Sequence, residues 1–223
     1  MPIEYKMRQR NRLDSYFRCL SSSCFYGGIG NFYVIYEVKP GGLILRRRQH
    51  NQILKNWKLK KAEDAISSIQ TLLNPDTYLP YQKEHARLLA LSEEARGRYL
   101  ESQRENDPEF IKLEVVNTCL YQLPSGNVSG YGAAWAIALS RVAFTENWIG
   151  ARELWDYRLA AARMAQQSYS SWEEFFVGYS AGLYYFESKP IQKYMFHNAM
   201  FSLMSGSSFL YKKIKWDMNL DPE

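Results

Sequence analysis

Apolar side chains recur at the three- and four-residue spacing of an α-helix through most of the chain after residue 54. One such run predicts a helix over residues 62–73, which an Asn-Pro pair would end. A longer, more polar helix is predicted over about 80–105, and an Asp-Pro pair that suits a helix start predicts another over about 108–123. A last helical segment is expected over about 190–205. These patterns indicate helices packed on one another rather than a sheet.

Residues 131–187 predict three helices with short connections between them. Gly150 is suited to cap the second of these helices, with Glu153 in its third position. Ser170 and Glu173 predict a capping box at the start of the third, in which each side chain bonds the other residue's backbone N–H. The three helices are therefore expected to form the centre of the fold.

The third helix carries the densest aromatic stretch of the chain, QSYSSWEEFFVGYSAGLYYF. Its large apolar residues lie at offsets of 0, 3, 4, 7, 11 and 14 and form one stripe: Trp172, Phe175, Phe176, Tyr179, Leu183 and Phe186. Gly178 and Gly182 leave a lane where we expect the preceding, Ala-rich helix to approach. A ligand pocket would need polar groups among the rings, so we predict that the stripe is core. Tyr184 and Tyr185 lie off the stripe, where they would face a partner.

The first part of the chain follows a different pattern. Two β-rich runs, NFYVIYEV and LILRRR, flank a Pro-Gly pair and predict a β-hairpin over residues 32–48. An isolated hairpin is only marginally stable in water, so it would lean on the helices. The predicted fold is mainly α: a compact bundle of about six helices with a small N-terminal β-hairpin. We expect a single domain, 1–223, made of a basic N-terminal segment, 1–53, and a helical core, 54–216.

The composition is that of a folded globular chain, with 46% hydrophobic and 23% charged residues. No apolar run reaches the ~20 residues that a membrane-spanning helix needs, so no membrane partner is expected. The N-terminus lacks the apolar segment of a secretory signal. Three cysteines, an odd number, fit reduced thiols in a cytoplasm, which is the localisation that we predict.

The net charge of +5 is unevenly distributed. Residues 1–61 hold 13 Lys/Arg and 3 Asp/Glu, a net charge of +10, whereas residues 62–223 hold 15 and 20, a net charge of −5. We expect a basic partner-binding stripe formed by Arg46, Arg47, Arg48, Lys55, Lys58, Lys60 and Lys61. Three interpretations are open: a solvated hairpin edge that resists aggregation, a docking surface for an acidic protein, or a nucleic-acid site in which Tyr33, Tyr36 and Trp57 stack on bases.

No set of side chains in the sequence forms a recognisable catalytic motif. His50, His85 and His197 stand in none of the spacings that a zinc site or a catalytic triad uses. We therefore predict no catalytic residue, cofactor or metal ligand, and no small-molecule ligand is indicated. The leading functional hypothesis is a non-enzymatic protein-binding module of the immunity or adaptor type. A nucleic-acid-binding protein and an enzyme of unrecognised type are the alternatives.

Residues 141–186 carry a resemblance to a known family. The family pattern has an Arg before a Gly-Tyr-Ile turn, an acidic helix, an Ala-rich helix and the run Ser-Ser-Trp-Glu-Glu-Phe, which map here onto Arg141, Trp148–Ile149 and the residues that follow. The segment resembles the YbeR/YbeU-like proteins, an uncharacterised bacterial family (domain of unknown function family 1266), with a looser likeness over 54–216. At 131–135 the chain departs from the family's Trp-Asp and Arg. The resemblance implies a helical fold and a bacterial cytoplasm, and it implies no activity.

Overall fold

The computed structural model of the protein describes residues 5–25, 44–102, 108–123, 128–188 and 211–222, with the backbone alone for 44–49 and 108. The described residues include nine α-helices and two short 3₁₀-helices, residues 211–213 are helical as well, and no described residue lies in a strand. The α-helices are α1 (Met7–Ser21), α3 (Ile44–Asn56), α4 (Ala62–Leu73), α5 (Leu79–Leu89), α6 (Glu93–Glu101), α7 (Pro108–Thr118), α8 (Ser129–Thr145), α9 (Ala151–Ser168) and α10 (Trp172–Phe186), and the 3₁₀-helices are η1 (Ser22–Cys24) and η2 (Pro75–Tyr78). The mainly helical class is confirmed. The expected number of about six helices is wrong, because α1 and α3 are also helical and one predicted helix is two.

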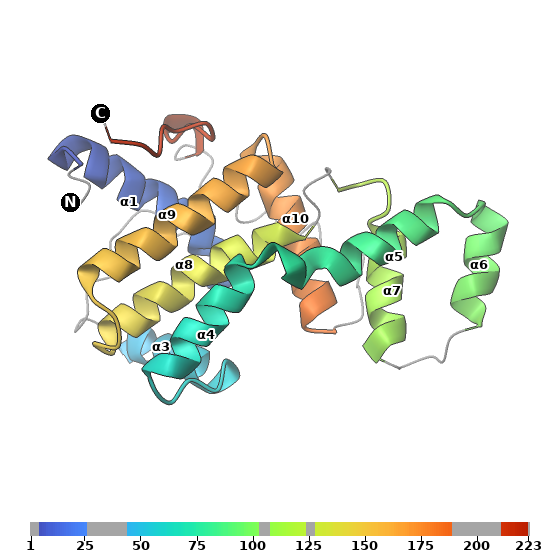
Figure 1. Ribbon diagram of the computed structural model, residues 1–223, viewed down its shortest axis with the longest axis horizontal. Helices are drawn as coiled ribbons and strands as arrows, with labels where there is room; N and C mark the ends of the chain where they lie inside the picture. The colour runs from blue at the N-terminus through green and yellow to red at the C-terminus, as the bar shows by residue number, and fades with distance from the viewer. Residues whose placement is uncertain (1–4, 26–43, 103–107, 124–127, 189–210, 223) are drawn as a thin grey trace.

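Helix α8 is the centre of the structure. It packs against α9, α4, α10 and α1, and 14 of its 17 residues are buried. Its sequence, SGYGAAWAIALSRVAFT, is rich in Gly and Ala, whose small side chains let several neighbours approach its backbone. In Figure 1, α4 and α9 lie on either side of α8, while α5, α6 and α7 extend away to the right. We call α5, α6 and α7 the arm, and the remaining helices the bundle.

The helix over 62–73 and the helix start at Pro108 are confirmed. The predicted helix over 80–105 is instead broken into α5 and α6. Ser92 caps α6, because its Oγ accepts the backbone N–H of Ala95 over 3.3 Å, and two glutamates follow in the first turn, where negative charge is favourable. A strong helix start inside a polar helical pattern thus favours a break.

The second strand of the predicted hairpin is wrong, since residues from Ile44 onward form α3. Arg, Gln and Leu are good helix formers, and Ile53 and Leu54 place apolar side chains of α3 against the core. The first strand and turn, at 32–43, lie outside the described residues, as does the segment 190–205. The second strand was predicted from the apolar run at the start of LILRRR, but the residues that follow it favour a helix.

Glycines bring α8 and α10 into close contact. A Cβ atom placed on Gly182 would stand 2.5 Å from Tyr131 Cβ and 2.8 Å from Val128 O, at the start of α8. A Cβ atom on Gly178 would overlap the Tyr169 ring. The lane of Gly178 and Gly182 is therefore occupied by α8 and Tyr169, and the expectation that α9 lies there is wrong. Helix α9 packs on α8 instead, whose many small residues let both neighbours approach.

The aromatic stripe of α10 is core, as predicted: Trp172, Phe175, Phe176 and Tyr179 are buried, and Leu183 and Phe186 are half-buried against them. The cap of α10 stands one residue later than predicted. Ser171 Oγ accepts the backbone N–H of Glu174 over 3.2 Å. The Glu174 carboxylate accepts the backbone N–H and the hydroxyl of Ser170, each over 2.7 Å. These hydrogen bonds lower the pKa of Glu174.

Residues 211–222 run antiparallel along α1, at the top of the view in Figure 1. The Tyr16 hydroxyl donates to Trp216 O over 2.9 Å, and the Tyr5 hydroxyl donates to Leu220 O over 2.8 Å. The two described ends of the chain are thus joined by hydrogen bonds, and together they cover one side of α9.

Candidate interaction site

Four of the basic residues singled out in the sequence converge where α3 ends and α4 begins. Lys55 lies in the last turn of α3, Lys58 and Lys60 lie in the connection, and Lys61 precedes α4; all four are exposed. We call these residues the lysine corner. The backbone of residues 46–48, the three arginines, belongs to the first turns of α3, and their side chains lie outside what the structure describes.

The connection is a Schellman turn that sets the direction of Lys58. The N–H of Leu59 donates to Leu54 O over 2.8 Å, and the N–H of Lys58 donates to Lys55 O over 3.2 Å, which are the two hydrogen bonds of this motif. Lys58 has a φ of 53°, in the left-handed region that usually holds glycine at the end of a helix. The corner therefore keeps a lysine at a position where the backbone favours glycine.

Asp64 closes the corner from the side of α4. Its carboxylate accepts the backbone N–H groups of Lys60 over 3.0 Å and Lys61 over 3.2 Å, as suits a carboxylate in the first turn of a helix. The ammonium group of Lys61 also lies 3.8 Å from the Glu63 carboxylate. Lys61 is thus turned partly toward α4, and its charge is partly compensated there.

An open hollow of about 410 Å³ lies at the lysine corner. It is lined by Asn51, Leu54, Lys55, Lys58, Leu59 and Lys60. Leu59 is buried and Leu54 is half-buried, so the hollow has apolar surface as well as three lysines around it. Within the described part of the chain, no carboxylate lies at ion-pair distance from Lys55, Lys58 or Lys60. The structure therefore brings together three of the predicted lysines and leaves Lys61 beside them.

Sequence analysis missed three lining residues, Asn51, Leu54 and Leu59. The available signal was two leucines five residues apart near a helix end, which suits the apolar contact that accompanies a Schellman turn. Glycine normally marks this turn between such leucines. Lys58 stands there instead, and so the turn was hidden.

The core holds the corner in place. The ring of Trp57 lies 5.2 Å from the ring of Trp135 in α8, and Leu59 is buried. Nε2 of His50 in α3 lies 2.6 Å from Oε1 of Glu146, just after α8. Trp57 thus packs against the core, rather than standing exposed beside the lysines.

The other basic residues of the N-terminal segment lie elsewhere. Lys6, Arg8, Arg10 and Arg12 are exposed on α1, and the guanidinium of Arg10 lies 5.4 Å from the centre of the Trp155 ring. In Figure 1, α1 and α3 lie at opposite sides of α8 and α9. The described basic residues of this segment therefore lie on two surfaces, and the lysine corner holds only part of them.

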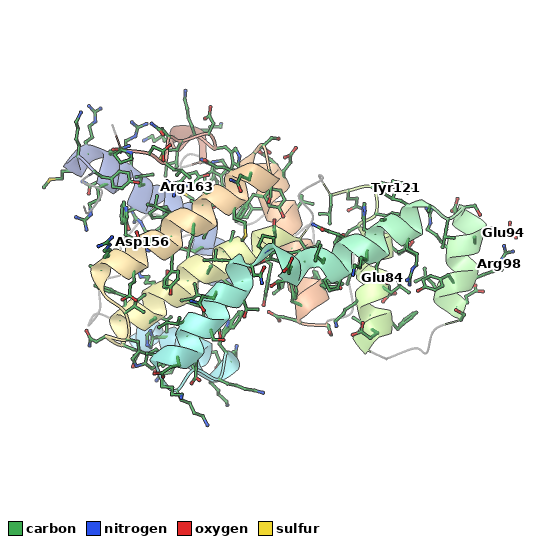
Figure 2. All side chains as sticks on the ribbon, viewed as in Figure 1. Glu84, Glu94, Arg98, Tyr121, Asp156 and Arg163 are labelled. Atoms are coloured by element: carbon green, nitrogen blue, oxygen red, sulfur yellow. The ribbon has the colours of Figure 1, made fainter. Side chains whose placement is uncertain are left out.

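Charged side chains on the arm form ion pairs within single helices. Arg98 lies 2.8 Å from Glu94 in α6, and Arg87 lies 3.1 Å from Glu84 in α5. Figure 2 shows Glu94 and Arg98 together on the outer side of α6. Such exposed pairs contribute little to stability, because solvent screens them. Their charges are locally compensated, in contrast to those of the three lysines around the hollow.

Tyr185 does not face solvent. It is buried against Tyr81 of α5, with ring centres 5.2 Å apart, and burial raises its pKa to about 12. The expectation that Tyr184 and Tyr185 face a partner is therefore wrong for Tyr185, because α7 covers this side of α10. Tyr184 is half-buried beside it.

No cluster of three or more His, Cys, Asp or Glu side chains that could hold a metal ion occurs among the described residues. His85 Nε2 lies 3.0 Å from Leu120 O, and His197 lies outside the described ranges. Burial raises the pKa of the Cys19 and Cys119 thiols to about 12, which makes them poor nucleophiles near neutral pH. Among the described residues, none of the helices combines the length and the apolar character that a membrane span requires.

Sequence comparison adds a family to this geometry. The family model described as "Protein of unknown function (DUF1266)" matches residues 52–216, about three-quarters of the chain. The chain belongs to the DUF1266 family. No curated protein and no solved structure matches it. Membership of a family of unknown function is thereby confirmed, while the YbeR/YbeU relation and the bacterial origin stay predictions.

The DUF1266 match includes the whole lysine corner, and it begins after α1, which therefore lies outside it. Tyr16 and Phe17 of α1 are nevertheless among the largest fully buried side chains. Trp216, at the other end of the match, accepts a hydrogen bond from Tyr16 at its carbonyl. The packed core of the protein therefore extends beyond the segment that defines DUF1266.

Proposed function

We propose that this DUF1266 protein is a non-enzymatic binding module, of the adaptor or immunity type, that docks an acidic surface of a partner protein on its lysine corner. One observation carries the proposal: Lys55, Lys58 and Lys60 are exposed around a hollow, and no described carboxylate pairs with them. Complementary charge of this kind speeds encounter and selects partners. We include Arg46, Arg47 and Arg48 in the same surface, because they precede it in α3.

An acidic protein fits this corner better than a nucleic acid does. Proteins that bind single strands combine phosphate contacts with exposed aromatic rings on which bases stack. Of the three rings considered for stacking, Trp57 packs on Trp135 instead, and Tyr33 and Tyr36 lie outside the described residues. The described residues that line the hollow include Leu54 and Leu59 and no aromatic side chain on which a base could stack. The alternative interpretation, a solvated edge of a hairpin, loses its basis because Ile44–Asn56 is a helix.

We also propose a bacterial cytoplasm as the setting. Cys19, Cys24 and Cys119 are unpaired thiols, and thiols persist in reducing compartments. The resemblance to the YbeR/YbeU-like proteins supports the bacterial origin.

Charge reversal at the corner tests the proposed function. The test protein carries Lys55→Glu, Lys58→Glu and Lys60→Glu, and the control carries Lys6→Glu, Arg8→Glu and Arg12→Glu, an equal change in net charge on the exposed side of α1. The probe is a fluorescein-labelled peptide of alternating Glu and Ser, whose association rate is measured by stopped-flow anisotropy. At an ionic strength of ~0.1 M, where exposed charges more than ~10 Å apart are largely screened, we expect the corner variant to associate roughly tenfold more slowly or worse. The control should then stay within about twofold of the unmodified protein.

Both variants should keep their thermal midpoints within a few degrees, because exposed substitutions usually change stability by about 0.5 kcal/mol or less. Equal slowing in both variants would assign the effect to net charge and overturn the proposal. Tighter, steeply salt-dependent binding of oligothymidylate than of the peptide would assign the corner to nucleic acid. A third variant, with Arg46, Arg47 and Arg48 changed to Glu, decides whether the arginines share the surface: slower association supports this, and unfolding shows them to be structural.

A further inference from the structure

We propose that the hollow at the lysine corner is a socket for one apolar side chain of an acidic segment, so that the site recognises a leucine- or phenylalanine-like anchor flanked by carboxylates. This inference rests on the proposed function and adds the chemistry of the ligand to it. The occupant is a segment of a partner protein, and charge complementarity is what selects it.

The size of the hollow argues for more than ion pairing. It has a volume of about 410 Å³ and is open to solvent, which suits one side chain of a bound segment rather than an enclosed ligand. A carboxylate that meets an ammonium group at the rim would leave such a space filled with water. A larger group is needed to occupy it.

The walls argue for an apolar group. Leu54 and Leu59 line the hollow. Lysine side chains expose long methylene stems below their charged ends, so Lys55, Lys58 and Lys60 add apolar wall where they line it. The described lining residues include no acidic side chain and one neutral polar side chain, Asn51. An aliphatic or aromatic side chain would therefore meet apolar surface below and positive charge around its entry.

The backbone of Lys58 supports a role for this residue in binding. At a φ of 53° it occupies the position where helices favour glycine, and non-glycine residues held in such conformations cluster at functional sites. The Schellman turn fixes that position from Leu54 to Leu59. The turn thus fixes the Cα atom of Lys58 at the hollow, which this residue lines.

The test uses three labelled 12-residue peptides with the folded, full-length protein. The first has Glu on both sides of a central Phe, the second has Ser in place of Phe, and the third has Gln in place of every Glu. We expect the Glu–Phe peptide to bind roughly tenfold more tightly than the Glu–Ser peptide, because it buries one apolar side chain. Most of the gain should be slower dissociation, since charge sets the association rate. The Gln–Phe peptide should bind at least roughly tenfold more weakly.

Two variants locate the preference. Asn51→Trp would fill the hollow from an exposed position in α3, and should abolish the preference for Phe over Ser while the Glu–Ser peptide still binds. Asn11→Trp, an equal change on the exposed side of α1, should leave the preference intact. Lys58→Gly removes one ammonium group from a backbone that suits glycine, so it should weaken both acidic peptides without loss of helical circular dichroism.

Each result decides between the two levels of the proposal. Equal affinity for the Phe and Ser peptides, or a Phe preference that survives Asn51→Trp in a folded protein, overturns the socket and leaves the acidic docking surface in place. Failure of both acidic peptides to bind overturns the socket and the proposed function together. Oligothymidylate that binds more tightly than the Glu–Phe peptide, and competes with it, also overturns both.

Discussion

Helix α8 in the bundle and helix α6 in the arm show two ways in which one chain holds its helices. In α8, 14 of 17 residues are buried, and Gly and Ala let neighbouring backbones approach. In α6 none of the nine residues is buried, and the helix packs mainly on α7. A helix with so little buried surface depends on its cap and on pairs such as Arg98 with Glu94. Substitutions should therefore have large effects around α8 in the bundle and small ones on α6 and the exposed surface of the arm.

The largest effect is expected from Trp172→Ala. Trp172 is buried, its ring lies 5.0 Å from that of Trp216, and its Nε1 donates to Ile214 O over 2.9 Å. Loss of a buried ring of this size lowers the free energy of unfolding by roughly 3–5 kcal/mol, to be measured by urea denaturation. Tyr121→Ala is the control beside the arm, where the side chain is 74% exposed and contacts only the guanidinium of Arg96 among the interactions described, and it should change that energy by about 1 kcal/mol or less. Equal losses would refute the distinction between the two regions.

Replacing glycine by alanine should change the free energy of unfolding less, and in opposite directions in the two regions. Gly182→Ala would force a Cβ atom to within 2.8 Å of Val128 O at the α8–α10 contact, and overpacking of this kind lowers the free energy of unfolding by about 1–3 kcal/mol. Gly97 in α6 has open space around it, so Gly97→Ala should raise that energy by roughly 0.5–1 kcal/mol. Both are read from urea midpoints. A stabilised Gly182→Ala protein would show that α8 and α10 are not in close contact.

The smallest effect concerns local opening in the unmodified protein. We propose that 1–223 is one domain, because Met164 and Phe186 pack against both hydrophobic clusters, and that the arm opens more readily than the bundle. Cys119 belongs to the cluster beside the arm and Cys19 to the bundle. In mild urea we expect Cys119 to react with a thiol reagent before Cys19. At the urea concentration of the main unfolding transition, both thiols should react at the same rate. Mass spectrometry measures the extent of labelling at each cysteine.

Two results would contradict this picture. Labelling of Cys19 and Cys119 at the same rate in mild urea would remove the difference in opening. Two complete and separate unfolding transitions would show that the arm is a domain of its own.

The helical part of the fold was predictable where local chemistry decides it. Residues 62–73 have clear periodicity and a proline stop, and Gly150 donates its N–H to Glu153 over 2.8 Å, as its place before the helix predicted. The α10 cap was missed by one residue because SSWEE offers the same capping box in two registers. Burial of Trp172 as the first helical residue selects the later one, and sequence spacing alone does not contain that packing.

The candidate site was predictable as charge but not as shape. The lysines were identified because charge can be counted along a chain. The hollow depends on the left-handed Lys58 backbone, and that conformation leaves no mark in a sequence with no glycine there. Lys61 was grouped with the others, although helix α4 turns it toward Glu63. Which of the predicted lysines share a surface therefore depends on their contacts in the folded protein, such as that of Lys61 with Glu63.

The pairing of α1 with residues 211–222 has a consequence for how the protein is made. A ribosome synthesises residues 211–222 about 200 positions after α1. During that interval, Tyr16 lacks the carbonyl of Trp216 to which its hydroxyl donates in the finished structure. Contacts between such distant segments form late and slow folding. Helix α1 therefore stays partly uncovered until residues about 200 positions later have emerged, and a chaperone that shields α1 during translation would protect its apolar side.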